Sequence, residues 1–354
     1  MKGKKVAKMA KKKLRVGVIG CGAIGQRRHL PEYAAHPGVE LVAVTDIKYA
    51  RAKQAAEKFG AAHAFKNYRD MLKLELDAVS ICTPNYLHAV MTIDALKAKC
   101  HVLCEKPMAT TIRDIRAMNA AARKYRRQIM VGQNQRLAAA HVRGKEIYKS
   151  GELGKALSFS TSFAHGGPES WSMDGLDCFF FKKRQAVIGS LGDLGVHKID
   201  LIRWFLEDEV VLAGAMTGTL EKQNCTVDDT AYGVFRMRSG ILGQMFAGWV
   251  LKAGESNGTT ICCEKGVIKM YDHPKYSVTV QKANGENVFI QAGRIQTNEA
   301  GGQTSSGVID AFVAAIAGGS RVPISGQDGG ASVAAILACV ESARTRKFIR
   351  PATV

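Results

Sequence analysis

A glycine-rich turn near the N-terminus constrains the fold more than any other feature of this chain. The segment Gly20–Gly25 reads G-x-G-x-x-G, directly after the β-branched run Leu14–Ile19 and directly before a helix-like segment. Between a strand and a helix, Gly20 permits a tight turn, Gly22 lets the backbone approach a pyrophosphate, and Gly25 allows the helix to pack closely on the strand. The pattern therefore predicts a dinucleotide-binding turn.

A carboxylate follows at the spacing that is typical of such turns. The amides of Ala23 and Ile24 open the predicted helix and would donate to a bound phosphate. Asp46 ends the next predicted strand, where it would accept hydrogen bonds from ribose hydroxyls and repel a 2′-phosphate. This favours NAD, although Lys48 and Arg51 could reach a 2′-phosphate and leave NADP open. The alternative role for Asp46 is an ordinary helix cap.

The first half of the chain alternates strand-like and helix-like segments. Strands are predicted at Leu14–Ile19, Val39–Thr45, Asp77–Cys82, His101–Cys104 and Gln128–Val131. Helices are predicted at Ile24–Ala35, Tyr49–Phe59, Leu87–Ala98 and Ile112–Tyr125. This βαβαβ succession needs right-handed crossovers and a parallel sheet with helices on both faces. Residues 14–133 are therefore predicted to form a doubly wound α/β domain.

The pattern changes after about residue 133, where one helix, Ala138–Lys149, leads into alternating runs. Strands are predicted at Ala156–Ala164, Ala231–Arg238, Ile241–Val250 and Ser277–Gln281. Late helices are predicted at Gly307–Ala317 and Asp328–Arg344. Residues 134–354 are therefore predicted to form a second, α+β domain around an open, mostly antiparallel sheet, with both late helices in it.

Composition excludes several classes of protein. Hydrophobic residues make up 46% and charged residues 23%, which fits neither disorder nor a fibre. Because no apolar run approaches the roughly 20 residues of a membrane span, the chain is expected to be soluble. The net charge is +19, but seven of the basic residues lie in Met1–Lys13, which has no acid and no aromatic residue. This segment, 1–13, is predicted to be a disordered basic tail, with no nucleic-acid or membrane partner.

The nine cysteines are scattered and none shows a C-x-x-C spacing. Free thiols of this kind indicate a reducing, cytoplasmic setting. Neither the histidines nor the cysteines show a zinc-like spacing, so no metal is expected.

Two further motifs follow predicted strands at the same edge of the first sheet. Thr83–His88 follows the strand that ends at Cys82, and its proline cannot extend that strand. Glu105–Pro107 follows the next strand and brings one carboxylate and one cation to the crevice. An ordinary turn and a solvated ion pair are the alternatives. The polar side chains of the two motifs are Thr83, Asn85, His88, Glu105 and Lys106.

A helix predicted within Gly189–Phe205 carries another chemical signature. Asp193 and His197 are four residues apart and share a face that differs from the apolar stripe. A carboxylate placed in this way can hold an imidazole in one tautomer and stabilise its protonated form, as a proton-transfer base requires. The alternative is a helix-capping Asp with an incidental His.

In their order along residues 14–346, these motifs resemble the glucose–fructose oxidoreductase / inositol dehydrogenase / rhizopine catabolism (Gfo/Idh/MocA) family. The resemblance implies a Rossmann domain followed by an open, mostly antiparallel sheet domain, with the substrate at the nicotinamide between them. It also implies a homodimer or homotetramer formed through the exposed face of the second sheet.

The resemblance assigns roles residue by residue. Lys106 is similar to the catalytic lysine of the family, Asp193 to its partner carboxylate and His197 to its acid/base. The expected cofactor contacts are Gly20, Gly22, Ala23, Ile24, Asp46 and Glu105, with Thr83, Asn85, His88 and Lys106 at the nicotinamide side. The expected substrate contacts are Lys106, Asp193, His197, His165 and one residue of Gln133–Arg136, for which Arg136 is the candidate.

Residue chemistry and resemblance together predict an NAD(P)-dependent oxidoreductase that acts on a secondary alcohol of a sugar or cyclitol. His197 would take the hydroxyl proton while hydride passes to the nicotinamide. Asp193 would orient His197, and Lys106 would polarise the substrate oxygen. Two alternatives stay open, a redox-neutral glycosidase that uses NAD and a non-enzymatic sugar-sensing regulator on the same fold.

Overall fold

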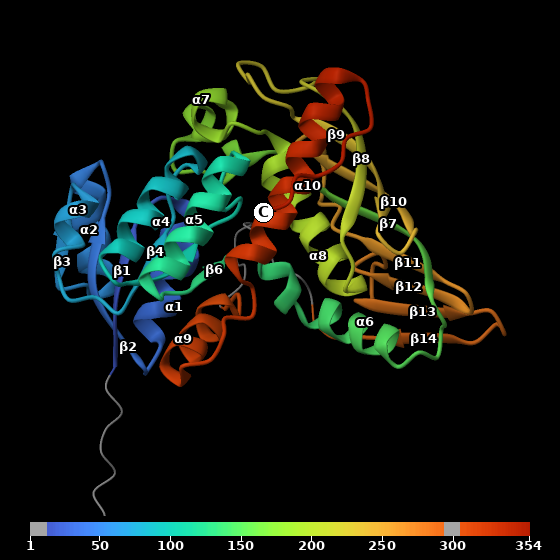
Figure 1. The fold of residues 1–354 in the computed structure, drawn as a ribbon, viewed down its shortest axis with the longest axis horizontal. Coiled ribbons are helices and arrows are strands. Elements are labelled where there is room, and N and C mark those ends of the chain that lie inside the picture. Colours follow the sequence, from blue (N-terminus) through green and yellow to red (C-terminus); the bar gives the residue numbers. More distant parts are fainter. Residues whose placement is uncertain (1–12, 294–304) are drawn as a thin grey trace, which may run out of the picture.

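Two sheets, each with its own helices, form the molecule in a computed structural model that describes residues 13–293 and 305–354. Figure 1 shows the two sheets side by side, with the start of α10 between them. The predicted basic tail lies outside the described residues, apart from Lys13.

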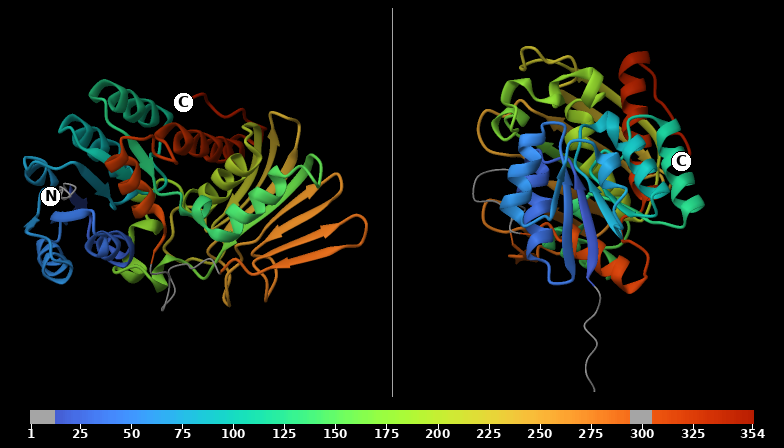
Figure 2. Two further views of the ribbon diagram at one scale, coloured as in Figure 1. Left: turned by 90° about the horizontal axis from the view of Figure 1, so that it is seen from below. Right: turned by 90° about the vertical axis from the view of Figure 1, so that its left-hand side faces the viewer.

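The first sheet is parallel throughout and has the order β3-β2-β1-β4-β5-β6. Its strands are β1 (Leu14–Ile19), β2 (Val39–Thr45), β3 (His63–Phe65), β4 (Ala78–Ile81), β5 (His101–Cys104) and β6 (Ile129–Val131). Its helices are α1 (Leu30–Ala35), α2 (Tyr49–Phe59), α3 (Tyr68–Met71), α4 (His88–Lys97) and α5 (Ile112–Tyr125). Helices cover both faces of the sheet (Figure 2). The strand order reverses between β1 and β4, so their carboxyl ends border the crevice where ligands bind in such sheets.

Burial on both faces explains why the central strands are apolar runs rather than alternating ones. All four residues of β4 are buried, and so are the last four of β1. Each predicted strand of this domain occurs within one residue of its predicted bounds. Two elements, β3 and α3, have no counterpart in the prediction, because three or four residues are too few to show a period.

The second sheet has the order β14-β13-β12-β11-β7-β10-β9-β8 and is antiparallel except for the parallel pair β7 and β10. Its strands are β7 (Ala156–Ala164), β8 (Val210–Gly218), β9 (Thr230–Met237), β10 (Leu242–Gly248), β11 (Thr259–Cys263), β12 (Gly266–Met270), β13 (Val278–Lys282) and β14 (Asn287–Ile290). The helices of this region are α6 (Ala139–Lys149), α7 (Lys183–Ala186) and α8 (Val196–Leu206). The predicted fold class is confirmed.

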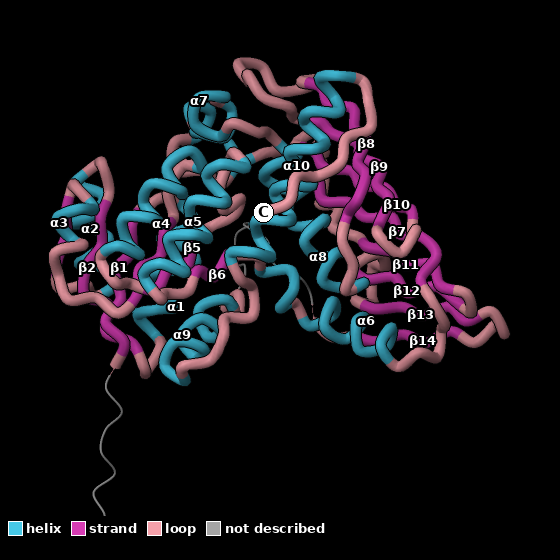
Figure 3. The backbone as a smooth tube through the Cα atoms, viewed as in Figure 1, coloured by secondary structure: helices cyan, strands magenta, loops and turns pink. Residues whose placement is uncertain are grey.

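One face of the second sheet is covered by helices and the other is open. Helices α6, α8 and α10 lie on the same side of the strands (Figure 3). In β9 the inward residues Phe235 and Met237 are buried, whereas Tyr232, Val234 and Arg236 point outward. This alternation is typical of an antiparallel sheet with one packed face.

The C-terminal segment returns to the first sheet before it packs on the second. Its helices are α9 (Val308–Gly318) and α10 (Gly326–Thr345). Val131 N in β6 donates to Ile324 O at 3.0 Å, and Gln128 Oε1 accepts from Val322 N at 2.9 Å. Helix α10 then packs on α8 and β8. The alternation pattern predicts both late helices in the second domain, whereas the segment leading into α10 is bound to the first. In the two described ranges, no helix is long and apolar enough to cross a membrane.

Candidate active site

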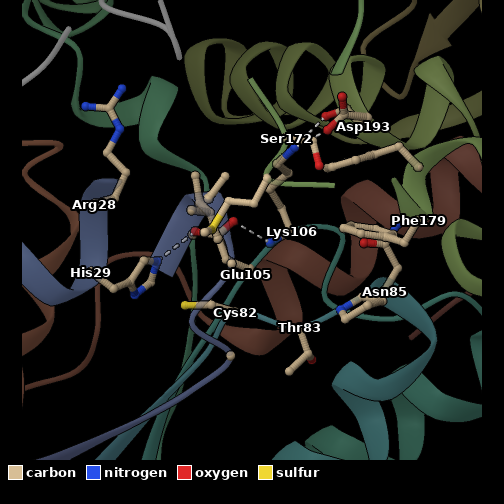
Figure 4. Close-up of a pocket in the computed structure, with 18 of the residues that line it drawn as sticks. Arg28, His29, Cys82, Thr83, Asn85, Glu105, Lys106, Ser172, Phe179 and Asp193 are labelled. Atoms are coloured by element: carbon tan, nitrogen blue, oxygen red, sulfur yellow. Dashed lines mark hydrogen bonds and ion pairs between the residues drawn. The ribbon is translucent and has the colours of Figure 1, made fainter. Parts of the chain in front are cut away.

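A cavity of about 880 Å³ lies between the two domains, at the carboxyl ends of strands of the first sheet. The second domain contributes two parts of the cavity wall, the helical turn that leads into α8 and the loop after β7 (Figure 4). The predicted site residues that line the cavity are Gly20, Gly22, Ala23, Ile24, Asp46, Thr83, Asn85, Glu105, Lys106, His165, Asp193 and His197. Two predicted residues, His88 and Arg136, are not part of this lining.

The glycine turn is crowded at two glycines and open at the third. A Cβ at Gly20, whose φ is +98°, would lie 2.4 Å from the carbonyl oxygen of Cys82. A Cβ at Gly25 would lie 2.4 Å from the carbonyl oxygen of Gly20. Among the residues that the structure describes, nothing lies within 4 Å of a Cβ at Gly22, which lines the cavity. The turn therefore has a cradle at Gly22 that fits a pyrophosphate.

Asp46 is held at the edge of that cradle. Its Oδ2 accepts from the backbone amide of Cys21 at 3.0 Å, and its Oδ1 accepts from the amide of Lys48 at 2.8 Å. The guanidinium of Arg51 lies 3.8 Å from Oδ2. Helix α2 begins at Tyr49 without a side-chain cap, so Asp46 is not a helix cap. Its carboxylate is positioned beside the glycine turn.

A histidine that no sequence motif indicates fixes Glu105. The helix after the glycine turn begins as a π-helical turn, Gly25–His29, before α1. His29 Nε2 lies 2.9 Å from Glu105 Oε1, and its Nδ1 lies 3.1 Å from Ser80 Oγ. Burial would raise the pKa of Glu105, but the hydrogen bond to His29 and the charges of His29 and Lys106 lower this pKa overall. The Glu105 carboxylate is therefore ionised at neutral pH.

Lys106 and Asp193 join the two domains inside the cavity. Lys106 Nζ donates to Asp193 Oδ1 at 2.5 Å and to the main-chain oxygen of Asp193 at 3.0 Å. Asp193 Oδ2 accepts from the indole Nε1 of Trp249 at 3.2 Å. The two charged side chains are 16% and 4% exposed. Because opposite charges attract more strongly away from water, this pair fixes Lys106 Nζ at one point of the wall.

His197 lies in the first turn of α8, and its imidazole is buried and neutral. Its ring lies 5.8 Å from the Phe163 ring, centroid to centroid. Its Nδ1 is buried and has no hydrogen-bond partner among the residues that the structure describes. Burial lowers the pKa of His197 well below its usual value, and the charges of Lys106 and Lys198 lower this pKa further. A neutral imidazole is the form that accepts a proton.

The structure gives Asp193 partners other than the predicted His197. Asp193 lies in a five-residue π-helical turn, Leu191–Gly195, that precedes α8. Residues four apart align on an α-helix of 3.6 residues per turn, whereas a π turn is wider and changes this alignment. Both carboxylate oxygens are taken by Lys106 and Trp249. Asp193 therefore positions Lys106 directly.

The three polar residues after β4 have different partners. The ring nitrogens of His88 each lie 2.8 Å from a carbonyl oxygen, one of Thr83 and one of Pro107. His88 is fully buried and joins the two strand-end loops behind the cavity. Asn85 Nδ2 donates to the carbonyl of Ala186 in α7 at 3.0 Å, which connects the domains. Thr83 Oγ1 is buried and lacks a hydrogen-bond partner within residues 13–293 and 305–354.

Arg136 points away from the cavity, contrary to its predicted contact with a substrate. Its Nε and NH2 donate to the carboxylate of Asp200 at 2.6 and 2.7 Å, and both side chains are almost fully buried. A guanidinium held by a carboxylate in this bidentate way is fixed in place. From the same segment, Asn134 and Gln135 line the cavity instead.

A row of hydrogen-bonded side chains forms another wall. Gln135 Nε2 donates to Asn257 Oδ1, and Asn257 Nδ2 donates to Glu255 Oε1, each at 3.0 Å. All three residues line the cavity. Gln135 Oε1 is buried and accepts no hydrogen bond from the described chain. This wall offers acceptors for the hydroxyl groups of a ligand.

The loop after β7 supplies an aromatic wall. His165 Nδ1 accepts from the amide of Gly167 at 3.0 Å, and burial lowers the pKa of His165. The Trp171 and Phe180 rings meet edge to face with centroids 5.2 Å apart. His165, Trp171 and Phe180 all line the cavity. Among the described residues, no group of three or more His, Cys, Asp or Glu could hold a metal ion.

Comparison with known families decides the identity of this two-domain arrangement. Residues 14–133 match the model of an oxidoreductase family with an NAD-binding Rossmann fold, and residues 141–269 match the GFO/IDH/MocA C-terminal domain. The chain belongs to the Gfo/Idh/MocA family. The predicted resemblance is confirmed, and so is NAD as the cofactor of the family's Rossmann domain.

Named relatives of this Gfo/Idh/MocA protein include sugar dehydrogenases and a sugar reductase. D-Glucoside 3-dehydrogenase of Escherichia coli (strain K12) is 32% identical over 56% of this chain, and the match spans 55% of that protein. 1,5-Anhydro-D-fructose reductase of Ensifer adhaerens is 28% identical over 94% of this chain and 96% of its own length. A structure of levoglucosan dehydrogenase in complex with NADH and levoglucosan has a TM-score of 0.85 and 27% identity, and covers 97% of this chain and 100% of that one. The match thus spans about half the length of the first relative.

Several residues of this Gfo/Idh/MocA site carry no recognisable sequence signal. They are His29, Trp249, Glu255 and Asn257. Their partners are remote in sequence, since 76 positions separate His29 from Glu105 and 56 separate Asp193 from Trp249. Gln135 differs from these four residues, because it lies in the segment Gln133–Arg136 after the last predicted strand of the first domain, where a substrate contact is expected.

Proposed function

We propose that this protein is an NAD-dependent dehydrogenase that oxidises a secondary alcohol of a sugar or cyclitol. The supporting observation is that Lys106 Nζ, the neutral imidazole of His197 and the cradle at Gly22 line one cavity. By their names, the three relatives act on glucosides, anhydrofructose and levoglucosan, which are all sugars or sugar derivatives.

The residues present fit a nicotinamide dinucleotide. In this proposal the pyrophosphate lies at Gly22, Ala23 and Ile24, and the adenosine ribose lies at Asp46. Thr83, Asn85 and Glu105 face the nicotinamide end, and His88 supports their loops. The bound nicotinamide supplies the hydride acceptor, while the protein supplies position and charge.

The alcohol is placed between Lys106 and His197. An ammonium group has three hydrogens, and two of them point at Asp193, so one remains for the substrate oxygen. His197 accepts the hydroxyl proton. As the oxygen becomes more negative, the nearby cation of Lys106 stabilises it. Asp193 is a positioning residue, because it acts through Lys106.

Other hydroxyl groups of the substrate would meet the hydrogen-bonded wall and the aromatic loop. Gln135 Oε1 and the Glu255 carboxylate accept hydrogen bonds there, and His165 lines the same cavity. Gln135 replaces Arg136 as the proposed contact from the segment after β6. Arg136 holds α8 in place through Asp200.

The test is absorbance at 340 nm with purified protein, NAD and a panel of glucosides, levoglucosan, aldoses and inositols, together with the reverse reaction on keto sugars. NADH is expected with at least one substrate. His197→Ala should lower turnover on the order of 10²–10⁴-fold while dinucleotide binding persists. His63→Ala, an exposed histidine on β3, is the matched control and should keep full activity. Full activity in His197→Ala would overturn the assigned role.

A redox-neutral glycosidase would give a different result. It would release the aglycone from a chromogenic glycoside, retain its dinucleotide and show no net change at 340 nm. A sugar-sensing regulator would bind sugar and turn over neither class of substrate.

We propose that the protein is a homodimer or homotetramer formed through the open face of the second sheet. Tyr232, Val234 and Leu242 are about half exposed on neighbouring strands, and Met216 is 81% exposed. A second copy would bury this apolar face. Light scattering after gel filtration should give twice or four times the chain mass, and Val234→Lys should reduce it.

We also propose that residues 14–133 bind the cofactor, that residues 134–354 bind the substrate and form the oligomer, and that the protein works in the cytoplasm. Seven of the nine cysteines are buried thiols, which suits a reducing compartment. Fractionation of cells that express the tagged protein would test its location.

A further inference from the structure

A loop of the second domain reaches across to the far end of the dinucleotide site. Asp174, in the loop between β7 and α7, places Oδ1 2.8 Å from Lys48 Nζ and 3.0 Å from Arg51 NH2. The neighbouring Met173 Sδ lies 3.6 Å from Gln26 Nε2, beside the glycine turn. All of these residues except Gln26 line the cavity, together with Asp46. The loop therefore borders the place where the adenosine ribose fits.

Lys48 and Arg51 are the cations that would be needed to bind a 2′-phosphate. Lys48 is the N-cap residue of α2 and Arg51 lies in the first turn of that helix, where its NH1 is 3.8 Å from Asp46 Oδ2. In a site open to NADP, two such cations would be free to contact the phosphate. Here Asp174 forms ion pairs with both cations. The carboxylates of Asp46 and Asp174 thus balance the charges of Lys48 and Arg51.

We propose that Asp174 is a cofactor-selectivity residue, which pairs with Lys48 and Arg51 and adds a second carboxylate beside Asp46, so that the site accepts NAD(H) and rejects NADP(H). The selectivity for NAD(H) over NADP(H) is thus supplied partly by the second domain, which carries Asp174. The inference rests on the dinucleotide site alone and does not depend on which alcohol is oxidised.

One further cation lines the cavity beyond β3. Lys66 lines it together with Asp70, whose carboxylate is paired with Lys73 Nζ at 2.7 Å. Hydrogen bonds from Lys48 and Arg51 lower the pKa of Asp174, despite a smaller opposing effect of burial, so its carboxylate is charged at neutral pH. A dianionic 2′-phosphate would therefore meet the carboxylates of Asp46 and Asp174, which offset the charges of Lys48 and Arg51.

The experiment is a fluorescence titration of the full chain with NADH and with NADPH, which needs no sugar substrate. Asp174→Asn should raise the affinity for NADPH relative to NADH by about tenfold, equivalent to about 1.4 kcal/mol. Asp174→Lys should shift the same ratio further. Asp177→Asn is the control, because Asp177 lies in the same loop, is 97% exposed and, among the described residues, forms an ion pair only with Lys182, at 4.0 Å.

A double-mutant cycle separates selectivity from a purely structural role. Because Asp174 acts largely by occupying the two cations, Asp174→Asn should change the ratio much less in a Lys48→Ala/Arg51→Ala background, where only its repulsion of the phosphate remains. An equal loss of NADH and NADPH affinity would overturn the proposal and make Asp174 a loop anchor only. A ratio that moves no further than in Asp177→Asn would also overturn it. A failure to oxidise sugars would affect neither result.

Discussion

Two buried salt bridges hold the segment that runs from the π-helical turn into α8, and their surroundings differ. Lys106–Asp193 faces the cavity. Arg136–Asp200 is sealed, with side chains 5% and 1% exposed and a further hydrogen bond from Ser332 Oγ to Asp200 at 2.8 Å. The first pair presents a cation to the cavity, whereas the second is enclosed between helical segments. We therefore propose that the first pair serves the reaction and the second serves rigidity.

The largest expected effect is on stability, from the sealed pair. Arg136→Met leaves the Asp200 carboxylate buried without its cation and should lower the free energy of unfolding by about 3–5 kcal/mol. Urea titration followed by circular dichroism measures this. The double variant Arg136→Met/Asp200→Leu should recover most of the loss, because no fully buried lone charge remains. Asp328, which lies 3.6 Å from Arg136, is 38% exposed and can be solvated. A loss below about 1 kcal/mol in the single variant would remove the contrast between the two pairs.

For the Lys106–Asp193 pair, which faces the cavity, the larger effect should be on activity and the smaller one on stability. Lys106→Met is expected to lower kcat on the order of 10²–10³-fold, the usual cost of losing one group that stabilises a developing oxyanion. Its unfolding free energy should change less than that of Arg136→Met, because Asp193 keeps its bond from Trp249 and can meet water in the cavity. Steady-state kinetics and urea titration of both variants test the comparison. Equal destabilisation of the two variants would show that Lys106–Asp193 is also a structural pair.

The pH profile sharpens the role of the cavity cation. Burial, with the charges of Lys106 and Lys198, keeps the pKa of His197 below its usual 6.5, so the acid limb of kcat/KM for oxidation should lie below pH 6.5. The unfolded chain takes up a proton near pH 6.5 that folded His197 does not, so this group lowers stability as the pH falls below 6.5. In Lys106→Met the acid limb should move to higher pH, since one positive charge is gone. A wild-type limb above pH 6.5 would contradict this.

The smallest effect is expected from an exposed pair. Glu146→Gln breaks the contact of Arg143 with Glu146 on α6, where both side chains are about half exposed. The free energy of unfolding should change by less than about 0.5 kcal/mol. Thermal unfolding of this variant gives the reference against which the effects at the two buried pairs are compared. A loss of stability larger than about 0.5 kcal/mol would mean that burial does not distinguish the buried pairs from this exposed one.

The first domain could be predicted from the sequence in more detail than the second. Its motifs at Gly20–Gly25 and Glu105–Pro107 each follow directly after a strand, so local sequence fixes their place at the sheet edge. The cavity wall from the second domain is built differently. Glu255 and Asn257 flank Ser256, which bridges to Ala164 at the end of β7, and no local pattern marks them.

The helix that bears His197 shows where local reasoning fails even within a motif. Asp193 and His197 are both part of the cavity wall, as the spacing predicts. Their direct contact assumes an α-helix at a point where the chain forms a π turn, and Leu191–Gly195 offers no sequence sign of this change. The resemblance to the family predicts Arg136 at the substrate, yet its guanidinium is bonded to the buried carboxylate of Asp200.

The return of the C-terminal segment to β6 limits how far the molecule can be treated as two separable modules. β6 is an edge strand, and such edges pair readily with other chains when they are bare. Here Val131 N bonds to Ile324 O, and Met130 bridges to Ser325, so residues from beyond the second sheet cap the first one. A gene fragment that stops near residue 133 would omit this cap. The dinucleotide-binding domain should therefore not be expressed alone or fused to another protein without the segment around Ile324.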